Sequence, residues 1–374
     1  MKLRPHHWLL EKAYLIGFHG KWDESPTPIN LEGIRKILVI RNDNIGDVVC
    51  TTPLLRNLRQ AFPKAFLAVL VCRLTQEVVE GNPDIDQVFI YDKAKHGRYR
   101  SPWVAWWKQF QVLLRLRRLG FDLVLGVRSE FSSPQAWMAF FTGAPWRIGR
   151  QPKSRDQKFA FFYTHFLESP GKNMHEVERS LEFLKPLGIK AAFEKLSMDI
   201  PVSSQEALAH LVTPNEPSKQ LRRIGLHLTS RMEEGKYWDD QNYINLSHRI
   251  NGLPQTDLFF SYGPDQVQTA QRILPHLPPG VKTLLTENLK TFGAYAKALE
   301  LLITIEGGPM HLAAAVGIPL LALYGKTDPA VWYPWGVPFK ALRQGRQENL
   351  ITVDEVFREI QTFFDRHPSW GTDR

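Results

Sequence analysis

Short apolar runs rich in β-branched residues alternate with stretches of helical pattern along most of the chain. Runs without a polar face are typical of parallel strands that helices cover on both sides. In the first half, this pattern predicts strands at 37–41, 66–72, 88–91 and 123–127. In the second half, it predicts strands at 224–228, 258–261, 283–285, 301–305 and 320–324. The alternation predicts an α/β fold that begins as a doubly wound parallel sheet.

Helices are predicted between these strands and at the end of the chain, at 48–61, 75–80, 101–119, 175–187 and 353–364. The length of 374 residues is enough for two domains, each with its own core. Prolines among Ser, Glu and Lys mark a domain boundary. The expected division is an N-terminal extension at 1–33, a first domain at 34–200, a linker at 201–223, a second domain at 224–350 and a C-terminal helix and tail at 351–374.

The segment 300–336 combines a buried strand, a Gly-Gly turn, an Ala-rich helix and a second buried strand. Pro309 stands at the expected start of the helix, where free N–H groups and the helix dipole favour an anion. His311 lies in the first turn, so its ring can face that anion. The alternative is an ordinary strand–helix–strand packing unit, and the unusual string Glu-Gly-Gly-Pro-Met-His favours the anion site.

Positive charge is concentrated in the first half. Residues 1–200 carry 30 Lys and Arg against 20 Asp and Glu, a net +10, while the whole chain is at +9. Such an excess indicates an acidic partner, whether phosphorylated lipid, a membrane surface or nucleic acid. Residues 8–18 could form a basic amphipathic helix on a membrane, or equally pack on the protein itself. Two cysteines are too few for a disulfide framework or a cysteine-based metal site.

Two further clusters have both a functional and a structural interpretation. Arg147 and Arg150 open a segment in which basic and aromatic residues interleave, as in sites for phosphosugars or single-stranded nucleic acid. A solvated surface is the default for each of these residues. The Asp84-Ile85-Asp86 triplet invites comparison with the metal motif of some sugar transferases, but its Asn-Pro-Asp context favours a structural turn.

Three segments together resemble glycosyltransferase family 9, the ADP-heptose:lipopolysaccharide heptosyltransferases. They are ILVIRNDNIGDVVCTTPLLRNLRQAFPKAFLAVLV, HLTSRMEEGKYW and EGGPMHLAAAVGIPLLALYGKTDPAVWYPWG. The resemblance implies a GT-B architecture, in which two Rossmann-like domains face each other across a cleft. It also implies an inverting, metal-independent transfer of heptose from ADP-heptose to a phosphorylated lipid A-core acceptor. The expected location is cytoplasmic, peripheral on the inner membrane.

The resemblance also assigns residues. Asp47 matches the catalytic aspartate, although it could instead cap the following helix, as could Asn44. No cofactor and no nucleic-acid partner is expected. No metal is expected either, because a lysine and a helix start can stabilise the diphosphate. The donor-binding residues are expected to be Thr229, Ser230, Lys236, Asp265, Glu306, Gly307, Gly308 and His311, and the acceptor-binding residues Arg128, Arg147 and Arg150.

One departure from the family pattern leaves alternatives open. The family most often has Asp followed by Ser or Thr where this chain has Glu306 and Gly307, which puts the identity of the nucleotide-sugar in doubt. A second interpretation is therefore a GT-B transferase with another nucleotide-sugar or glycan acceptor. A third is a basic nucleic-acid-binding module. A nicotinamide dehydrogenase is disfavoured because no G-x-G-x-x-G follows the first strand.

Overall fold

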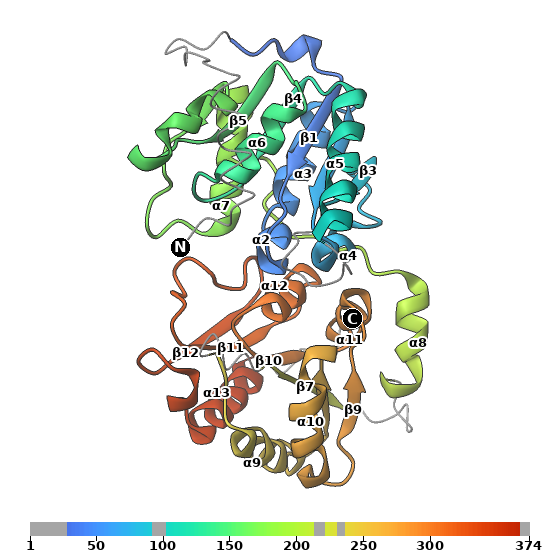
Figure 1. Ribbon diagram of the computed structural model, residues 1–374. Coiled ribbons are helices and arrows are strands. Elements are labelled where there is room, and N and C mark those ends of the chain that lie inside the picture. The colour runs from blue at the N-terminus through green and yellow to red at the C-terminus, as the bar shows by residue number, and fades with distance from the viewer. Residues whose placement is uncertain (1–27, 92–101, 213–220, 230–235, 367–374) are drawn as a thin grey trace.

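The computed structural model describes residues 28–91, 102–212, 221–229 and 236–366. They form two stacked domains, each built on a six-stranded, wholly parallel sheet with helices on its faces (Figure 1). The expectation of an α/β protein with two Rossmann-like domains is therefore confirmed. Among the described helices, none has the length and apolarity needed to cross a membrane.

The first sheet has the strand order β3-β2-β1-β4-β5-β6. Its central strand β1 pairs on both sides, so that Ile40 lies opposite Leu70 of β2 and Gly126 of β4. Four of the five β1 side chains are buried, which explains the unbroken apolar run. The strands are β1 (Lys36–Ile40), β2 (Phe66–Val71), β3 (Gln87–Ile90), β4 (Leu123–Gly126), β5 (Trp146–Arg150) and β6 (His165–Leu167).

The second sheet has the order β12-β11-β10-β7-β8-β9, which repeats the first when it is read from β9. In this correspondence β7 takes the place of β1, and β10 takes the place of β4. The strands are β7 (Arg222–Leu228), β8 (Thr256–Tyr262), β9 (Lys282–Leu285), β10 (Leu301–Ile305), β11 (Leu320–Tyr324) and β12 (Phe339–Arg343).

Each sheet has a topological switch point, where the chain connections that leave two adjacent strands run in opposite directions across the sheet. It lies between β1 and β4 in the first domain and between β7 and β10 in the second. Ligands of open parallel sheets bind at the carboxyl ends of the strands beside this switch point. Asp47 follows β1 and Arg128 follows β4, while Thr229 follows β7 and Glu306 follows β10. The topology therefore places residues predicted from the sequence at both switch points.

Helices join the two domains as well as covering the sheets. The largest apolar cluster contains Val48 of α2 and Leu54 of α3 together with Ala296 of α11 and Leu312 of α12, so it runs across the domain contact. In Figure 1 the helices α2 and α12 meet where the domains touch. The helices of the first domain are α2 (Ile45–Val49), α3 (Thr52–Ala61), α4 (Gln76–Val79), α5 (Pro102–Leu119), α6 (Ser133–Phe141) and α7 (Glu176–Leu181). Those that follow are α8 (Val202–Val212), α9 (Asp240–Asn251), α10 (Val267–Ile273), α11 (Leu289–Lys297), α12 (Gly308–Ala315) and α13 (Val353–Arg366).

Short 3₁₀ segments complete the described secondary structure. They are η1 (Leu31–Gly33), η2 (Arg73–Thr75), η4 (Ser154–Phe162), η5 (Glu182–Leu187), η7 (Pro264–Gln266), η8 (Leu274–His276) and η9 (Glu348–Leu350).

Prolines explain two differences from the predicted helices. The helix expected at 48–61 is broken into α2 and α3, because Pro53 has no N–H to donate to the carbonyl of Val49. The hydroxyl of Thr52 donates to that carbonyl instead, at 2.8 Å. The helix expected at 175–187 likewise changes to the 3₁₀ segment η5, which contains Pro186.

Other segments carry structure that the sequence pattern did not predict. Helix α8 lies within the proposed linker at 201–223, and β7 begins inside it at Arg222. Strands β5, β6 and β12 were not predicted, since the arginines of β5 interrupt its apolar pattern and β12 is largely exposed. The proposed N-terminal extension falls mostly outside the described residues, and with it the segment at 8–18.

Candidate functional site

The first-domain half of the candidate site is the turn between β1 and α2. Asp47 lies in the first turn of α2, with about a sixth of its side chain exposed. Its Oδ1 accepts a hydrogen bond from Arg41 Nη2 at 2.6 Å, and its Oδ2 accepts from the backbone N–H of Asn44 at 3.2 Å. Asp47 therefore helps to cap α2, as the structural alternative expected, while its carboxylate remains partly open to solvent.

Arg41 is buried beneath Asp47. Its guanidinium donates to Glu176 Oε1 at 2.7 Å and to the carbonyl of Val127 at 2.9 Å, and its Nε lies 3.7 Å from Asp43. Burial alone would lower the pKa of Arg41, but the carboxylates of Asp47, Glu176 and Asp43 together raise it above its ordinary value. The guanidinium is thus a permanent positive charge next to the candidate base.

The second-domain half lies at the carboxyl ends of β7 and β10. Glu306 follows β10 and is nearly buried, and its Oε2 accepts from Lys236 Nζ at 2.5 Å. Thr229 follows β7, and its hydroxyl lies 3.5 Å from that of Thr304. Lys236 keeps about a fifth of its side chain exposed, so its ammonium can also reach a ligand. Ser230 lies outside the described residues.

The two halves meet where the start of α2 touches the start of α12. A Cβ added to Gly46 would lie 2.7 Å from Cδ2 of His311, and one added to Gly308 would lie 3.1 Å from Cβ of Ile45. A side chain at Gly46 would therefore force the His311 ring to move, and one at Gly308 would crowd Ile45, so both glycines allow the two helix starts to approach closely. Gly307 is the N-cap of α12 and directly follows Glu306. The structure thus brings Asp47, Glu306, Gly307, Gly308 and His311 into one region.

His311 is buried and faces the first domain. Burial lowers its pKa to about 4, against the opposing effect of the nearby carboxylates Glu306 and Asp47. The imidazole is therefore neutral near pH 7. Its Nδ1 lies 3.9 Å from the thiol of Cys50, and its Nε2 is buried without a hydrogen-bond partner in the described structure. A buried ring nitrogen left without a partner is suited to bind a group supplied by a ligand.

Two further predicted residues lie at the same strand ends with less distinctive contacts. Asp265 is exposed at the start of η7, just after β8, and accepts from Gln266 at 3.1 Å. Arg128 follows β4, is about a third exposed and donates to Asp43 at 2.5 Å. Their assignments to donor and acceptor remain predictions.

The structure does not favour the expected acceptor role of Arg147 and Arg150. Arg150 is buried, and its guanidinium donates to the carbonyls of Arg128, Glu168 and Arg179 at 2.7–3.1 Å. Arg147 lies near the other end of β5 and donates to the carbonyls of Phe162 and Ala144. Both side chains hold backbone carbonyls together, so their interleaving with aromatic residues reflects packing.

The Asp84-Ile85-Asp86 triplet also has a structural role, as its turn context predicted. Asp84 pairs with Arg56 of α3 at 2.7 Å, and Asp86 pairs with Arg59 of the same helix at 2.5 Å. Asp86 additionally accepts from the backbone of Leu67.

Sequence reasoning missed a polar network behind Asp47. Glu176, the first residue of α7, is fully buried between Arg41 and Ser129, whose hydroxyl donates to Glu176 Oε2 at 2.5 Å. The sequence did carry one signal for this network, which is the position of Arg41 directly after an apolar strand that ends at the predicted site. Nothing in the local sequence indicated that Glu176 would lie beside it.

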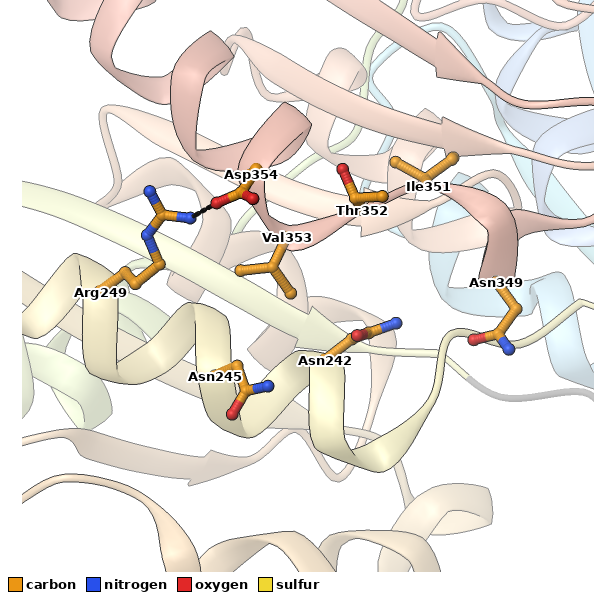
Figure 2. A pocket seen from close by; sticks show the side chains of 8 residues that line it. All are labelled: Asn242, Asn245, Arg249, Asn349, Ile351, Thr352, Val353 and Asp354. Carbon is orange, nitrogen blue, oxygen red and sulfur yellow. Dashed lines mark hydrogen bonds and ion pairs between the residues drawn. The ribbon is translucent and has the colours of Figure 1, made fainter.

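A hollow of the described surface lies away from this site. It encloses about 440 Å³ between α9 and the start of α13, and Figure 2 shows that Arg249 and Asp354 close one end of it. In Figure 1 these helices lie on the side of the second domain away from the first. The hollow is therefore separate from the region of Asp47 and His311. Its lining residues are Asn242, Asn245, Arg249, Asn349, Ile351, Thr352, Val353 and Asp354.

Comparison with known proteins identifies the family. The profile of glycosyltransferase family 9 (heptosyltransferase) matches residues 110–359. The chain is 24% identical over 315 residues to lipopolysaccharide heptosyltransferase 3 of Escherichia coli, covering 83% of this chain and 89% of the relative. It is also 24% identical over 345 residues to lipopolysaccharide heptosyltransferase 1 of Salmonella typhimurium, covering 87% and 99%.

Solved structures agree with the fold. A family 9 glycosyl transferase from Veillonella parvula superposes with a TM-score of 0.77 at 20% identity, covering 91% of this chain and 99% of that one. The E. coli heptosyltransferase WaaC with ADP-2-deoxy-2-fluoro heptose superposes with a TM-score of 0.69 at 20% identity, covering 88% and 99%. The profile match over most of the chain shows that this protein is a glycosyltransferase with the GT-B architecture and belongs to family 9, the heptosyltransferases.

Proposed function

We propose that this protein transfers a heptose from ADP-heptose to a phosphorylated sugar of the lipopolysaccharide inner core, with inversion and without a metal ion. The observation that carries the proposal is the convergence of two different kinds of group on one region. A partly exposed carboxylate, Asp47, comes from the first domain. A lysine, a helix start and a neutral histidine, Lys236, Gly308 and His311, come from the second.

The proposed role of Asp47 is that of general base. Inverting transfer requires a base that removes the proton of the acceptor hydroxyl while that oxygen attacks the anomeric carbon. The bond from the anomeric carbon to the diphosphate breaks in the same step, and the nucleoside diphosphate leaves with the electron pair. Asp47 is suited to this role because Arg41 and Asn44 hold its carboxylate while part of it faces solvent.

The second domain would stabilise the departing diphosphate. Lys236 supplies a positive charge, and the first N–H groups of α12 supply donors at the positive end of the helix dipole. Nε2 of His311 can donate a further hydrogen bond to a phosphate oxygen when the ring is in the Nε2-protonated tautomer. Preorganised donors of this kind are usually the largest contribution to stabilising charge that develops in a transition state.

A screen of donors tests the function. The purified protein is incubated with ADP-, UDP- and GDP-sugars and a deacylated, phosphorylated core acceptor, and products are detected by mass spectrometry. We expect a heptose-sized mass increase with ADP-heptose, undiminished by a chelator. Transfer only from another nucleotide-sugar would favour the alternative GT-B transferase, in keeping with the unusual Glu306 and Gly307. Binding of single-stranded nucleic acid with a steep salt dependence, and no transfer, would favour the nucleic-acid module.

Lys236→Ala is expected to weaken ADP binding by roughly 1–3 kcal/mol, the cost of losing a charge-assisted contact to phosphate. Calorimetry with ADP measures the change. Lys282→Ala is a matched control. Lys282 of β9 pairs with Asp257 of β8 at 2.7 Å, in the same domain but outside the proposed site. Unchanged ADP affinity in Lys236→Ala would exclude Lys236 from the site.

A second variant separates two causes of that loss. Removing Lys236 also leaves the nearly buried carboxylate of Glu306 unpaired, and this charge would repel a phosphate. The double variant Lys236→Ala, Glu306→Gln removes the repulsion. The affinity that it recovers relative to Lys236→Ala measures the repulsion, and the remaining loss measures the direct contact.

The same proposal places the protein at the cytoplasmic face of the inner membrane, peripherally bound. Its support is the net charge of +10 in residues 1–200 together with the basic amphipathic pattern of residues 8–18. Removal of residues 1–27 should weaken binding to vesicles that contain anionic lipid, while binding of ADP is retained. Vesicles of zwitterionic lipid serve as the control, because they lack the charge that attracts basic segments. Early melting or precipitation of the truncated protein would show that the segment belongs to the core, against membrane binding.

A further inference from the structure

Both oxygens of the Asp47 carboxylate are held by a network that extends well beyond the reacting groups. Nη2 of Arg41 donates to Asp47 Oδ1 at 2.6 Å and to Glu176 Oε1 at 2.7 Å. This nitrogen carries two hydrogens, so these two carboxylates use both of them. Nη1 of the same guanidinium donates to Val127 at 2.9 Å, which fixes the plane of the group. Asp47 and Glu176 are therefore linked rigidly through one arginine.

Glu176 is itself held from both sides. Ser129 donates to its Oε2 at 2.5 Å, and Arg179 Nη1 lies 3.7 Å from the same oxygen. Its backbone N–H donates at 3.3 Å to the carbonyl of Val331, which lies in the loop at 325–338 of the second domain. The preceding residue, His175, contacts the carbonyl of Tyr333 in this loop at 3.0 Å. The position of Glu176 thus depends on how the two domains dock.

A fully buried glutamate and a fully buried arginine need an explanation beyond stability. Removing two charges from water costs several kcal/mol per ion, so apolar residues often stabilise a protein as well as a buried ion pair does. An extended chain of charges is useful where a third charged group must be held in one orientation. That third group here is Asp47, and it lies at the end of the chain that reaches solvent.

We propose that Glu176 is a positioning residue for the transfer reaction, which acts through Arg41 to hold the Asp47 carboxylate toward the acceptor hydroxyl. This inference rests on the proposed role of Asp47 as the base. Glu176 also compensates the positive charge of Arg41, so that the guanidinium orients Asp47 without fully neutralising it. The other charged and titratable groups that face this network are Asp43, Cys50, Arg150, Arg179 and His311.

The test is Glu176→Gln, which keeps the size and an oxygen acceptor for Arg41 but removes the charge. We expect kcat to fall about ten- to hundred-fold, as for other groups that orient a reacting residue. The KM for the donor and the affinity for ADP should stay the same. A fall in kcat at an unchanged donor KM separates an effect on the reacting groups from a loss of donor binding.

Glu182→Gln is the matched control. Glu182 pairs with the buried Arg150 at 2.8 Å in the same domain, and no hydrogen bond links it to Asp47. Its loss should lower the melting temperature without lowering kcat. A wild-type kcat in Glu176→Gln would overturn the inference. A kcat that falls equally in both variants would show a general electrostatic effect and would overturn it as well.

Two more variants make the result decisive. If Glu176→Gln fails to fold, Ser129→Ala takes its place, since it frees one oxygen of Glu176 and leaves the charge. It should lower kcat several-fold, and a wild-type kcat would overturn the inference. Asp47→Asn in the same assay separates this inference from the proposed function. Near-normal turnover in Asp47→Asn contradicts the base itself, whereas an inactive Asp47→Asn beside a fully active Glu176→Gln contradicts only the role of Glu176.

Discussion

Asp47→Asn is expected to lower turnover by about 10²–10⁴-fold, the usual contribution of general-base catalysis. Asparagine has nearly the same shape as aspartate, and its side-chain oxygen can still accept a hydrogen bond, but it cannot take up the proton of the acceptor hydroxyl. ADP affinity should barely change, because the proposed diphosphate contacts of Lys236 and His311 come from the second domain. The measurement is the initial rate of heptose transfer at saturating donor.

The contacts of Asp47 limit what else the substitution can do. Arg41 keeps the carboxylate of Glu176 and the carbonyl of Val127 as partners, so its charge is not left alone in the interior. The Asn side chain has a single acceptor oxygen, so it keeps either the hydrogen bond from Arg41 or the two from Asn44, and one or two hydrogen bonds are lost. We therefore expect a decrease in stability of about 1–3 kcal/mol, less than the roughly 5–15 kcal/mol that keeps a domain folded.

Turnover and melting temperature should be measured on the same Asp47→Asn preparation. A near-native melting temperature together with the lost turnover supports the base. Asn44→Ala is the matched control, because it removes the Asn44 amide contact to Asp47 Oδ2 at 3.1 Å and keeps the carboxylate. Turnover near that of the wild type in Asp47→Asn would show that Asp47 serves only to cap α2.

The sequence predicted the second domain's part of the site better than the first domain's. Glu306, Gly307, Gly308 and His311 are consecutive or one turn apart, so a local pattern is enough to group them. Asp47 was assigned through the resemblance of its segment, in which it follows a clear apolar strand, to glycosyltransferase family 9. Glu176 lies 135 residues beyond Arg41 in the chain, and only the packing of α7 brings it to the site. No pattern within a single segment carries that contact.

The arginines of the basic and aromatic segment make contacts that a local pattern could not reveal. A pattern of arginines among aromatic rings is compatible both with a ligand surface and with a strand whose arginines hold backbone carbonyls. Arg150 at the end of β5 takes the second role, because three carbonyls from different segments converge on it. Composition cannot distinguish these roles, since the partners are main-chain atoms that every sequence supplies. The strands at the centre of each sheet were predictable because buried parallel strands leave uninterrupted apolar runs.

Acidification from pH 7.5 to pH 5 is expected to lower the stability of the protein by several kcal/mol, through three buried histidines. Burial lowers the pKa of His175, His227 and His311 to about 4 each. In the unfolded chain each would titrate near its ordinary pKa of about 6.5. The unfolded state therefore binds protons between pH 6.5 and 4 that the folded state does not. Stability is fully present above pH 6.5 and is lost as the pH falls toward 4.

The size of the loss follows from the same values. At pH 5 each buried histidine contributes a loss of about 2 kcal/mol relative to pH 7.5, so the three together contribute about 6 kcal/mol. The contacts agree with neutral rings. Nδ1 of His175 accepts from the backbone N–H of Val177 at 3.1 Å, which a protonated ring could not do, and this leaves its Nε2 to donate to Tyr333. His227 packs against Phe292 and meets the hydroxyl of Ser261 at 2.9 Å.

Urea unfolding at pH 7.5 and pH 5 measures this loss, and one variant assigns part of it. His227→Asn keeps a polar atom near the place of Nδ1 and so can retain the contact with Ser261, but it has no proton to gain. The difference between the two pH values should shrink by about one third. The urea midpoint of His227→Asn is decisive, because a pH dependence equal to that of the wild type would mean that His227 is protonated in the folded protein.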